Sequence, residues 1–160
     1  MHTLIKLITL LFISSIFNFE LFGSEKIDTS RSILVTLSLP VFDRNHQNPY
    51  IALWLSNDDN KYKVLAVKRG NVKWLSSLKA FWRNIARENR NESDAVTSAT
   101  NRNKKLSYEF KINKSWDYIF FEVARENGKK ELIKMPLVFE GKCVLGNFEI
   151  ERVCIQVVDN

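Results

Sequence analysis

A short run in the middle of the chain gathers hydroxyl groups, small side chains and one carboxylate. It reads Asp94-Ala95-Val96-Thr97-Ser98-Ala99-Thr100. Asp94 and Thr97 can accept hydrogen bonds from nearby backbone N–H groups and so fix a turn or a helix start. The small side chains of Ser98 and Ala99 leave room for a large group to approach the hydroxyl of Thr100. The run therefore offers a hydroxyl that could be esterified if it is exposed.

The surroundings of this run would also suit a phosphate group. Backbone N–H groups left exposed at a turn or a helix start attract anions. Three basic side chains follow directly and could offset phosphate charge: Arg102, Lys104 and Lys105. The plainer alternative is a connecting loop, because clusters of Ser, Thr, Ala and Asn are common in loops and Asp94 could simply cap a short helix.

The form D-x-x-[ST]-x-A-[ST] resembles the recognition motif of extracytoplasmic flavin transferases, which link FMN through a phosphoester to the last hydroxyl residue. The resemblance implies covalent FMN on Thr100 and a recognition motif made of Asp94, Thr97, Ser98 and Ala99. It also implies two kinds of partner, a flavin transferase and a membrane or periplasmic redox protein. Flavin-carrying families often have Gly where this chain has Ser98, a position that tolerates small residues.

The N-terminal residues 1–23 have the pattern of a secretory signal peptide. Lys6 precedes a long apolar run from Leu7 to Phe17, and Leu21-Phe22-Gly23-Ser24 offers a cleavage region. An uncleaved anchor is the alternative, although the apolar run is short for a spanning helix. We expect residues 24–160 to form a single domain in the periplasm or another extracytoplasmic space. Export agrees with the motif, because the flavin transferases that it resembles work outside the cytoplasm.

Charge and missing motifs exclude several classes of function. The net charge of +6 favours a solvated basic surface, or contact with anionic membranes or acidic partners. An extracytoplasmic location argues against nucleic acid. After the signal peptide the only histidine is His46, and the chain has no HExxH, CxxC or CxxCH motif and no Gly-rich phosphate loop. We identify no catalytic residues, metal ligands or small-molecule substrate. An electron carrier is therefore favoured over an enzyme with its own catalytic side chains. A cofactor would supply the redox chemistry of such a carrier.

Two cysteines remain, Cys143 and Cys154, and an oxidising compartment permits a disulfide between them. A two-residue turn at Gly146-Asn147 would place Cys143 opposite Ile150 and too far from Cys154 for a bridge. The disulfide therefore requires residues 140–147 to be an irregular loop that folds back, and both arrangements remain open.

Alternating apolar residues predict about seven strands, and one of them, Tyr50–Leu55, is apolar throughout and should be covered on both faces. A bulge is expected between Ile150 and Val153, and Pro136 should mark an edge or a bulge. Hairpin signals between the strands favour a mainly β fold, an immunoglobulin-like antiparallel β-sandwich. The expected strands cover residues 33–39, 50–55, 62–67, 106–112, 117–124, 132–139 and 148–158.

One amphipathic helix is expected between the third and fourth strands, directly before the motif. Its apolar face has helical spacing and consists of Trp74, Leu75, Leu78, Phe81, Trp82 and Ile85. Such a stripe normally packs on the sheet. One ring of the stripe, that of Trp74, Phe81 or Trp82, could in addition contact an isoalloxazine, and Trp74 and Trp82 are the rings that we favour.

The order of these segments resembles a predicted-periplasmic family of unknown function over residues 33–140. The resemblance is carried by Tyr50–Trp54, Trp74–Trp82, Asp94–Thr100 and Phe121–Glu126. Members look like immunoglobulin-like sandwiches and are similar to covalently FMN-carrying proteins of extracytoplasmic electron transfer. The family's W-D-G segment and Pro-Gly-Tyr turn are reduced here to Asn113–Tyr118. The alternative from a different class is a cofactor-free periplasmic β-sandwich that binds or adapts other proteins.

Overall fold

The computed structural model describes residues 30–41, 48–68, 72–88, 105–126, 128–137 and 141–158. The expected signal peptide and the whole Asp94–Thr100 motif lie outside these residues, as does the side chain of Trp74. Within the described ranges, no helix is long and apolar enough to cross a membrane.

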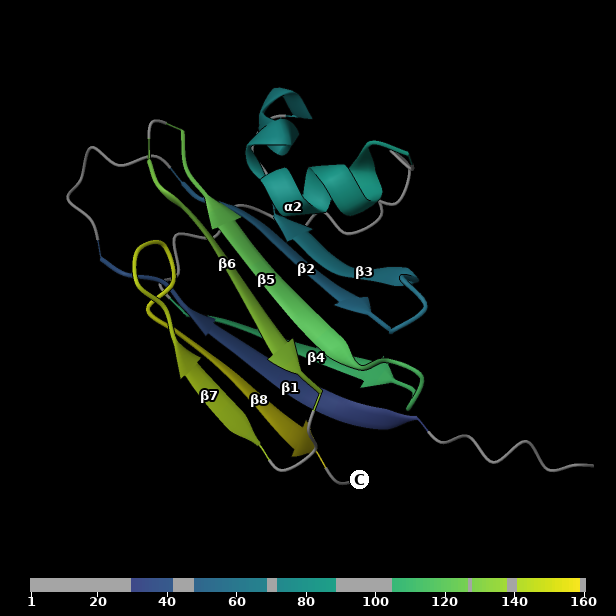
Figure 1. Cartoon of the computed structure of the whole chain (residues 1–160). Helices are drawn as coiled ribbons and strands as arrows, with labels where there is room; N and C mark the ends of the chain where they lie inside the picture. Colours follow the sequence, from purple (N-terminus) through teal and green to yellow (C-terminus); the bar gives the residue numbers. More distant parts are fainter. Residues whose placement is uncertain are drawn as a thin grey trace, which may run out of the picture.

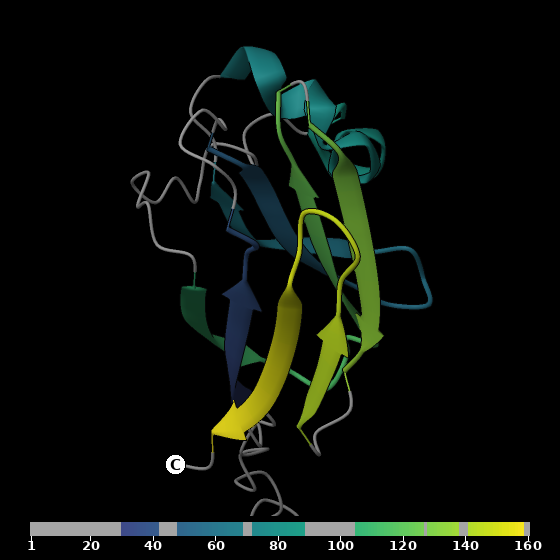
Figure 2. The same cartoon turned by 90° about the vertical axis from the view of Figure 1, so that its left-hand side faces the viewer.

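In the described part of the chain, eight strands form two four-stranded antiparallel sheets packed face to face (Figures 1 and 2). The first sheet has the order β4-β1-β8-β7 and the second has the order β3-β2-β5-β6. The strands of the first are β4 (Lys105–Ile112), β1 (Arg31–Ser38), β8 (Arg152–Val158) and β7 (Lys142–Leu145). The strands of the second are β3 (Tyr62–Lys68), β2 (Tyr50–Ser56), β5 (Tyr118–Ala124) and β6 (Lys130–Pro136).

The chain passes between the sheets in an immunoglobulin-like order. β1 lies in one sheet, β2 and β3 in the other, β4 returns beside β1, and β5 and β6 extend the sheet of β2. This is the path of strands B, C, C′, E, F and G of an immunoglobulin domain. β8 lies beside β1, where strand A would lie beside strand B. The predicted fold class is confirmed.

Alternate residues of the strands fill the space between the sheets, as a period of two requires. β1, β2 and β5 supply most of this core, and each fully buried aliphatic or aromatic side chain stabilises the fold by about 1.5–3 kcal/mol. Their contributions are Ile33, Val35, Leu37, Ile51, Leu53, Leu55, Ile119, Phe121 and Val123. These faces agree with the alternation read from the sequence.

A helical layer covers the outer face of the second sheet (Figure 1) and makes a second apolar cluster. It consists of the 3₁₀ segment η1 (Val72–Ser77), the short helix α2 (Lys79–Phe81) and the π-helical segment η2 (Trp82–Ala86). β2 is buried along its whole length because the sandwich core covers one face and this layer covers the other. The prediction of a central strand covered on both faces is confirmed.

The expectation of one continuous helix over this stripe is wrong. Leu78 leaves the helical conformation, with φ −78° and ψ 85°. In a continuous helix the N–H groups of Ala80 and Phe81 would donate to carbonyls one turn earlier, but here both donate to the carboxylate of Glu122 on β5. The apolar period correctly indicates which side chains are buried, since Leu75, Leu78, Phe81 and Ile85 all lie in the second cluster.

The C-terminal hairpin also differs from the expected two-residue turn at Gly146-Asn147. β7 was not expected as a strand, and the last strand begins at Arg152 rather than at residue 148. The connection runs from residue 146 to residue 151, so no bulge interrupts β8 and Cys143 pairs with Cys154 in register. The structure joins these cysteines by a disulfide, with their Cα atoms 4.1 Å apart. β6 is an edge strand, as Pro136 indicated, but it spans Lys130–Pro136 and not the expected residues 132–139.

The physical reason for the longer connection is the carboxylate of Glu131 on β6. It accepts hydrogen bonds from four successive backbone N–H groups at 2.5–3.0 Å, those of Asn147, Phe148, Glu149 and Ile150. Donors satisfied in this way do not need a strand partner. Gly146 packs against the carbonyl of Ile150 with no room for a side chain.

Candidate functional site

Glu122 is the only charged residue of β5, and it lies on the face that meets the helical layer. Its side chain is 3% exposed. The carboxylate accepts the N–H of Phe81 at 2.7 Å and that of Ala80 at 3.0 Å. Helix α2 has no side-chain cap of its own, so a residue from the sheet supplies the acceptor that its first N–H groups need.

Burial raises the pKa of the Glu122 carboxyl, because a charged group loses hydration inside the protein. Hydrogen bonds from the backbone of Phe81, Ala80 and Lys79 and the charge of Lys130 act in the opposite direction, but the pKa stays above its ordinary value. The native state therefore binds this proton more tightly than the unfolded chain does. Stability from this group falls as the pH rises from the ordinary carboxyl pKa through the raised one.

Replacing Glu122 by Gln should destabilise the protein by about 1–3 kcal/mol, because an amide offers one acceptor oxygen where two N–H groups need one each. The variant should also lose the pH dependence that this carboxyl causes. The difference in unfolding free energy from the wild type should therefore shrink as the pH rises above the ordinary carboxyl pKa. Urea unfolding between pH 4 and pH 7 measures it, and a difference that grows with pH would contradict the direction of the shift.

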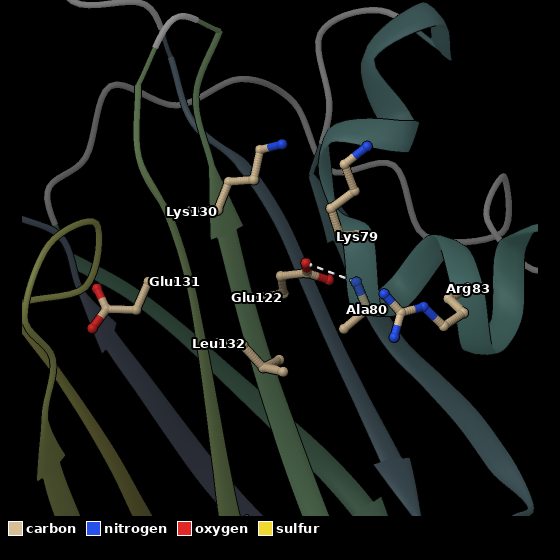
Figure 3. Close-up of a pocket in the computed structure, with 7 residues that line it drawn as sticks. All are labelled: Lys79, Ala80, Arg83, Glu122, Lys130, Glu131 and Leu132. Carbon is tan, nitrogen blue, oxygen red and sulfur yellow. Dashed lines mark hydrogen bonds between the residues drawn. The ribbon is translucent and has the colours of Figure 1, made fainter.

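A cavity of about 290 Å³ opens beside Glu122, between the helical layer and β6. Lys79 and Arg83 reach it from the helical layer and Lys130 reaches it from β6 (Figure 3). Leu132 is the cross-strand partner of Glu122 and adds an exposed apolar side chain. The complete lining is Lys79, Ala80, Arg83, Glu122, Lys130, Glu131 and Leu132. Figure 3 shows the carboxylate of Glu131 turned away from the other lining side chains, toward the loop that it holds.

Three aromatic rings pack between β2, β5 and the helical layer. Trp54 is fully buried and stacks on Phe120, with ring centroids 5.0 Å apart and planes within 5°. Phe81 packs against the same indole at 5.7 Å in a tilted arrangement. Among the rings considered as flavin contacts, Trp82 is half-buried against this cluster, whereas Phe81 is fully buried. The cluster fixes the position of the helical layer on the sheet.

The structure brings together residues that sequence reasoning did not single out as a site, namely Glu122, Lys79, Arg83 and Lys130. A single carboxylate within the apolar strand Tyr118–Ala124 was the available signal for Glu122. The lysines and the arginine gave none, since exposed basic residues are spread over the sequence. No group of three or more His, Cys, Asp or Glu within the described ranges is placed to hold a metal.

These features define a disulfide-bonded immunoglobulin-like sandwich with a helical layer on one sheet. The chain belongs to the DUF2271 family of predicted periplasmic proteins, whose family model matches residues 32–150. The match spans the helical layer, Glu122 and the Asp94–Thr100 motif, and the family description agrees with a location outside the cytoplasm. No curated protein and no solved structure matches the chain.

Proposed function

We propose that the protein carries FMN covalently on Thr100 and serves in extracytoplasmic electron transfer. The observation that carries this proposal is the run Asp94–Thr100 within a chain of a periplasmic family. A flavin transferase would recognise Asp94, Thr97, Ser98 and Ala99 and esterify the Thr100 hydroxyl. A membrane or periplasmic redox protein would then exchange electrons with the flavin.

The described residues on either side of the motif fit this role. The motif lies in sequence between the helical layer, which ends at Ala86, and the start of β4 at Lys105. Three basic side chains of the helical layer and β6, those of Lys79, Arg83 and Lys130, would attract a phosphate-linked group. The disulfide suits an oxidising compartment.

When attached, FMN would supply one- and two-electron chemistry that the side chains of this chain lack. The protein's contribution would be to present the flavin and to set its surroundings. The exposed basic residues would favour the negatively charged forms of the group, since nearby opposite charge stabilises an ion.

The experiment is the intact mass of the protein purified from periplasm in which a flavin transferase is active. We expect an added mass of FMN less one water, because ester formation joins the Thr100 hydroxyl to the phosphate with net loss of water. Thr100→Ala should lose both the added mass and the flavin fluorescence of the denatured chain. Thr100→Ser is the matched control and should keep both, because it retains the hydroxyl.

Other results would reject the proposal. An unmodified wild-type mass beside a transferase that labels a second substrate in the same cells would show that Thr100 is not a flavin site. Unchanged labelling of Thr100→Ala would show that another residue carries the group. The first of these would leave the cofactor-free binding module as the function to test.

A further inference from the structure

We propose that the cavity between the helical layer and β6 binds the phosphate group of a small organic molecule, with Lys79, Arg83 and Lys130 as its ligands. We take FMN as the ligand because the proposed function involves this phosphorylated molecule, and the choice of ligand therefore rests on the proposed function. The site itself consists of described residues and does not require that Thr100 be modified.

The first observation is that positive side chains line the cavity on two sides. Lys79 and Arg83 belong to successive helical segments, and Lys130 begins the facing edge strand (Figure 3). All three side chains are exposed and line the same opening. Because the helical layer is packed on the sheet through Trp54 and Phe81, the spacing between the two sides is fixed.

The second observation is that the neighbouring carboxylates are already engaged. Glu122 accepts the N–H groups of Ala80 and Phe81, and Glu131 accepts four N–H groups of the loop 146–151. Neither of the ion pairs Lys61–Asp59 and Arg125–Glu149 involves one of the three basic residues. Hydrogen bonds do not remove the charge of these carboxylates, and Lys130 interacts with that of Glu122. The three basic side chains of the lining nevertheless outnumber its two carboxylates, which leaves an excess of one positive charge for an anion to neutralise.

The third observation concerns the shape and chemistry of the ligand. A phosphate monoester carries up to two negative charges and several acceptor oxygens, which match three separate donors. A volume of about 290 Å³ lies at the lower end of small-molecule pockets. It fits a phosphate with part of an attached group, for which Leu132 and Ala80 form an apolar wall. A concave site of this size favours a small molecule over the surface of an acidic protein.

The test uses full-length Thr100→Ala protein, which separates the cavity from covalent attachment. Titration calorimetry with FMN, riboflavin and inorganic phosphate compares ligands with and without the phosphate group. We expect FMN to bind at least about tenfold more tightly than riboflavin, since a charge-assisted hydrogen bond contributes about this much. Inorganic phosphate should compete with FMN, and added salt should weaken binding because these charges are exposed.

A triple variant, Lys79→Gln with Arg83→Gln and Lys130→Gln, should bind FMN at least about tenfold more weakly. The matched control changes two exposed lysines and one exposed arginine of the other sheet, Lys111→Gln with Lys142→Gln and Arg152→Gln. It removes the same total charge and should leave the affinity unchanged. An equal loss of FMN affinity in the two variants would show a general effect of net charge and would overturn the proposal.

Equal affinity for FMN and riboflavin, or no binding of either FMN or phosphate, would also overturn the proposal. If polyglutamate bound and FMN did not, the basic cluster would be a surface for acidic proteins and the small-molecule site would be wrong. None of these results depends on the mass of the Thr100 adduct. A failure of flavin attachment therefore remains distinguishable from a failure of the cavity.

Discussion

Replacing Glu131 by Ala should lower the free energy of unfolding by about 1.5–3 kcal/mol, the contribution of hydrogen bonds to a charged acceptor. The side chain is 8% exposed and satisfies four consecutive N–H groups of the loop between β7 and β8. Without the carboxylate these donors would lose their acceptor in a partly buried place. The loop would then no longer be held against β6. Urea unfolding at pH 7 measures the loss, and a loss below about 1 kcal/mol would contradict this account of the loop.

The same residue should make stability depend on pH. Burial alone would raise the pKa of the Glu131 carboxyl, but the four backbone donors together outweigh burial and hold the pKa below its ordinary value. The stabilisation is therefore complete above the ordinary carboxyl pKa and is lost as the pH falls through the depressed one. Glu131→Gln is the matched control for size. The difference in unfolding free energy between this variant and the wild type should become smaller as the pH falls below about 4. For Glu122→Gln the corresponding difference should become smaller as the pH rises.

Replacing Phe81 by Ala should cost about 3–5 kcal/mol, because it removes a fully buried ring and leaves a cavity beside Trp54. The loss of stability should be concentrated in the helical layer, since Phe81 belongs to the second apolar cluster and not to the core between the sheets. Hydrogen exchange should therefore accelerate most at Leu75–Ala86 and least at the inward-facing residues of β1.

Phe148→Ala is the control for this prediction. It makes the same chemical change at a ring that is 49% exposed and should cost less than about 1 kcal/mol. If Phe81→Ala accelerated exchange equally in the helical layer and in β1, the layer and the sandwich would unfold as one unit. Independent opening of the layer would then be disproved.

Much of the fold could be predicted because local periodicity reports burial. The alternation in β1 and β5 indicated which side chains face the core, and the apolar run of β2 indicated cover on both faces. Two expectations were wrong, the continuous helix before the motif and the two-residue turn at Gly146-Asn147, and both errors have the same cause. Glu122 interrupts the helix and Glu131 shapes the last loop by accepting backbone hydrogen bonds from segments distant in sequence. No local pattern reports such contacts, although a carboxylate in a mostly apolar strand is a sign of them.

The proposed functional residues also fall into two groups, those that the sequence reveals and those that only the structure reveals. The Asp94–Thr100 motif is visible in the sequence alone, because the modifying enzyme that we propose would read neighbouring residues along the chain. The cavity of Lys79, Arg83 and Lys130 is visible only in the structure, because it needs two segments that meet through the packing of Phe81 on Trp54. Sequence reasoning therefore finds the proposed attachment point and misses the surroundings.

The order of the strands has a consequence for solubility. β3, β4, β6 and β7 form the open borders of the two sheets, and each of them contains at least one lysine. The four interior strands, β1, β2, β5 and β8, contain none. An open border exposes unpaired backbone groups that invite a strand from another molecule, and lysine there discourages such pairing by repulsion and hydration. The basic character of the chain thus protects the sandwich from aggregation through its edges.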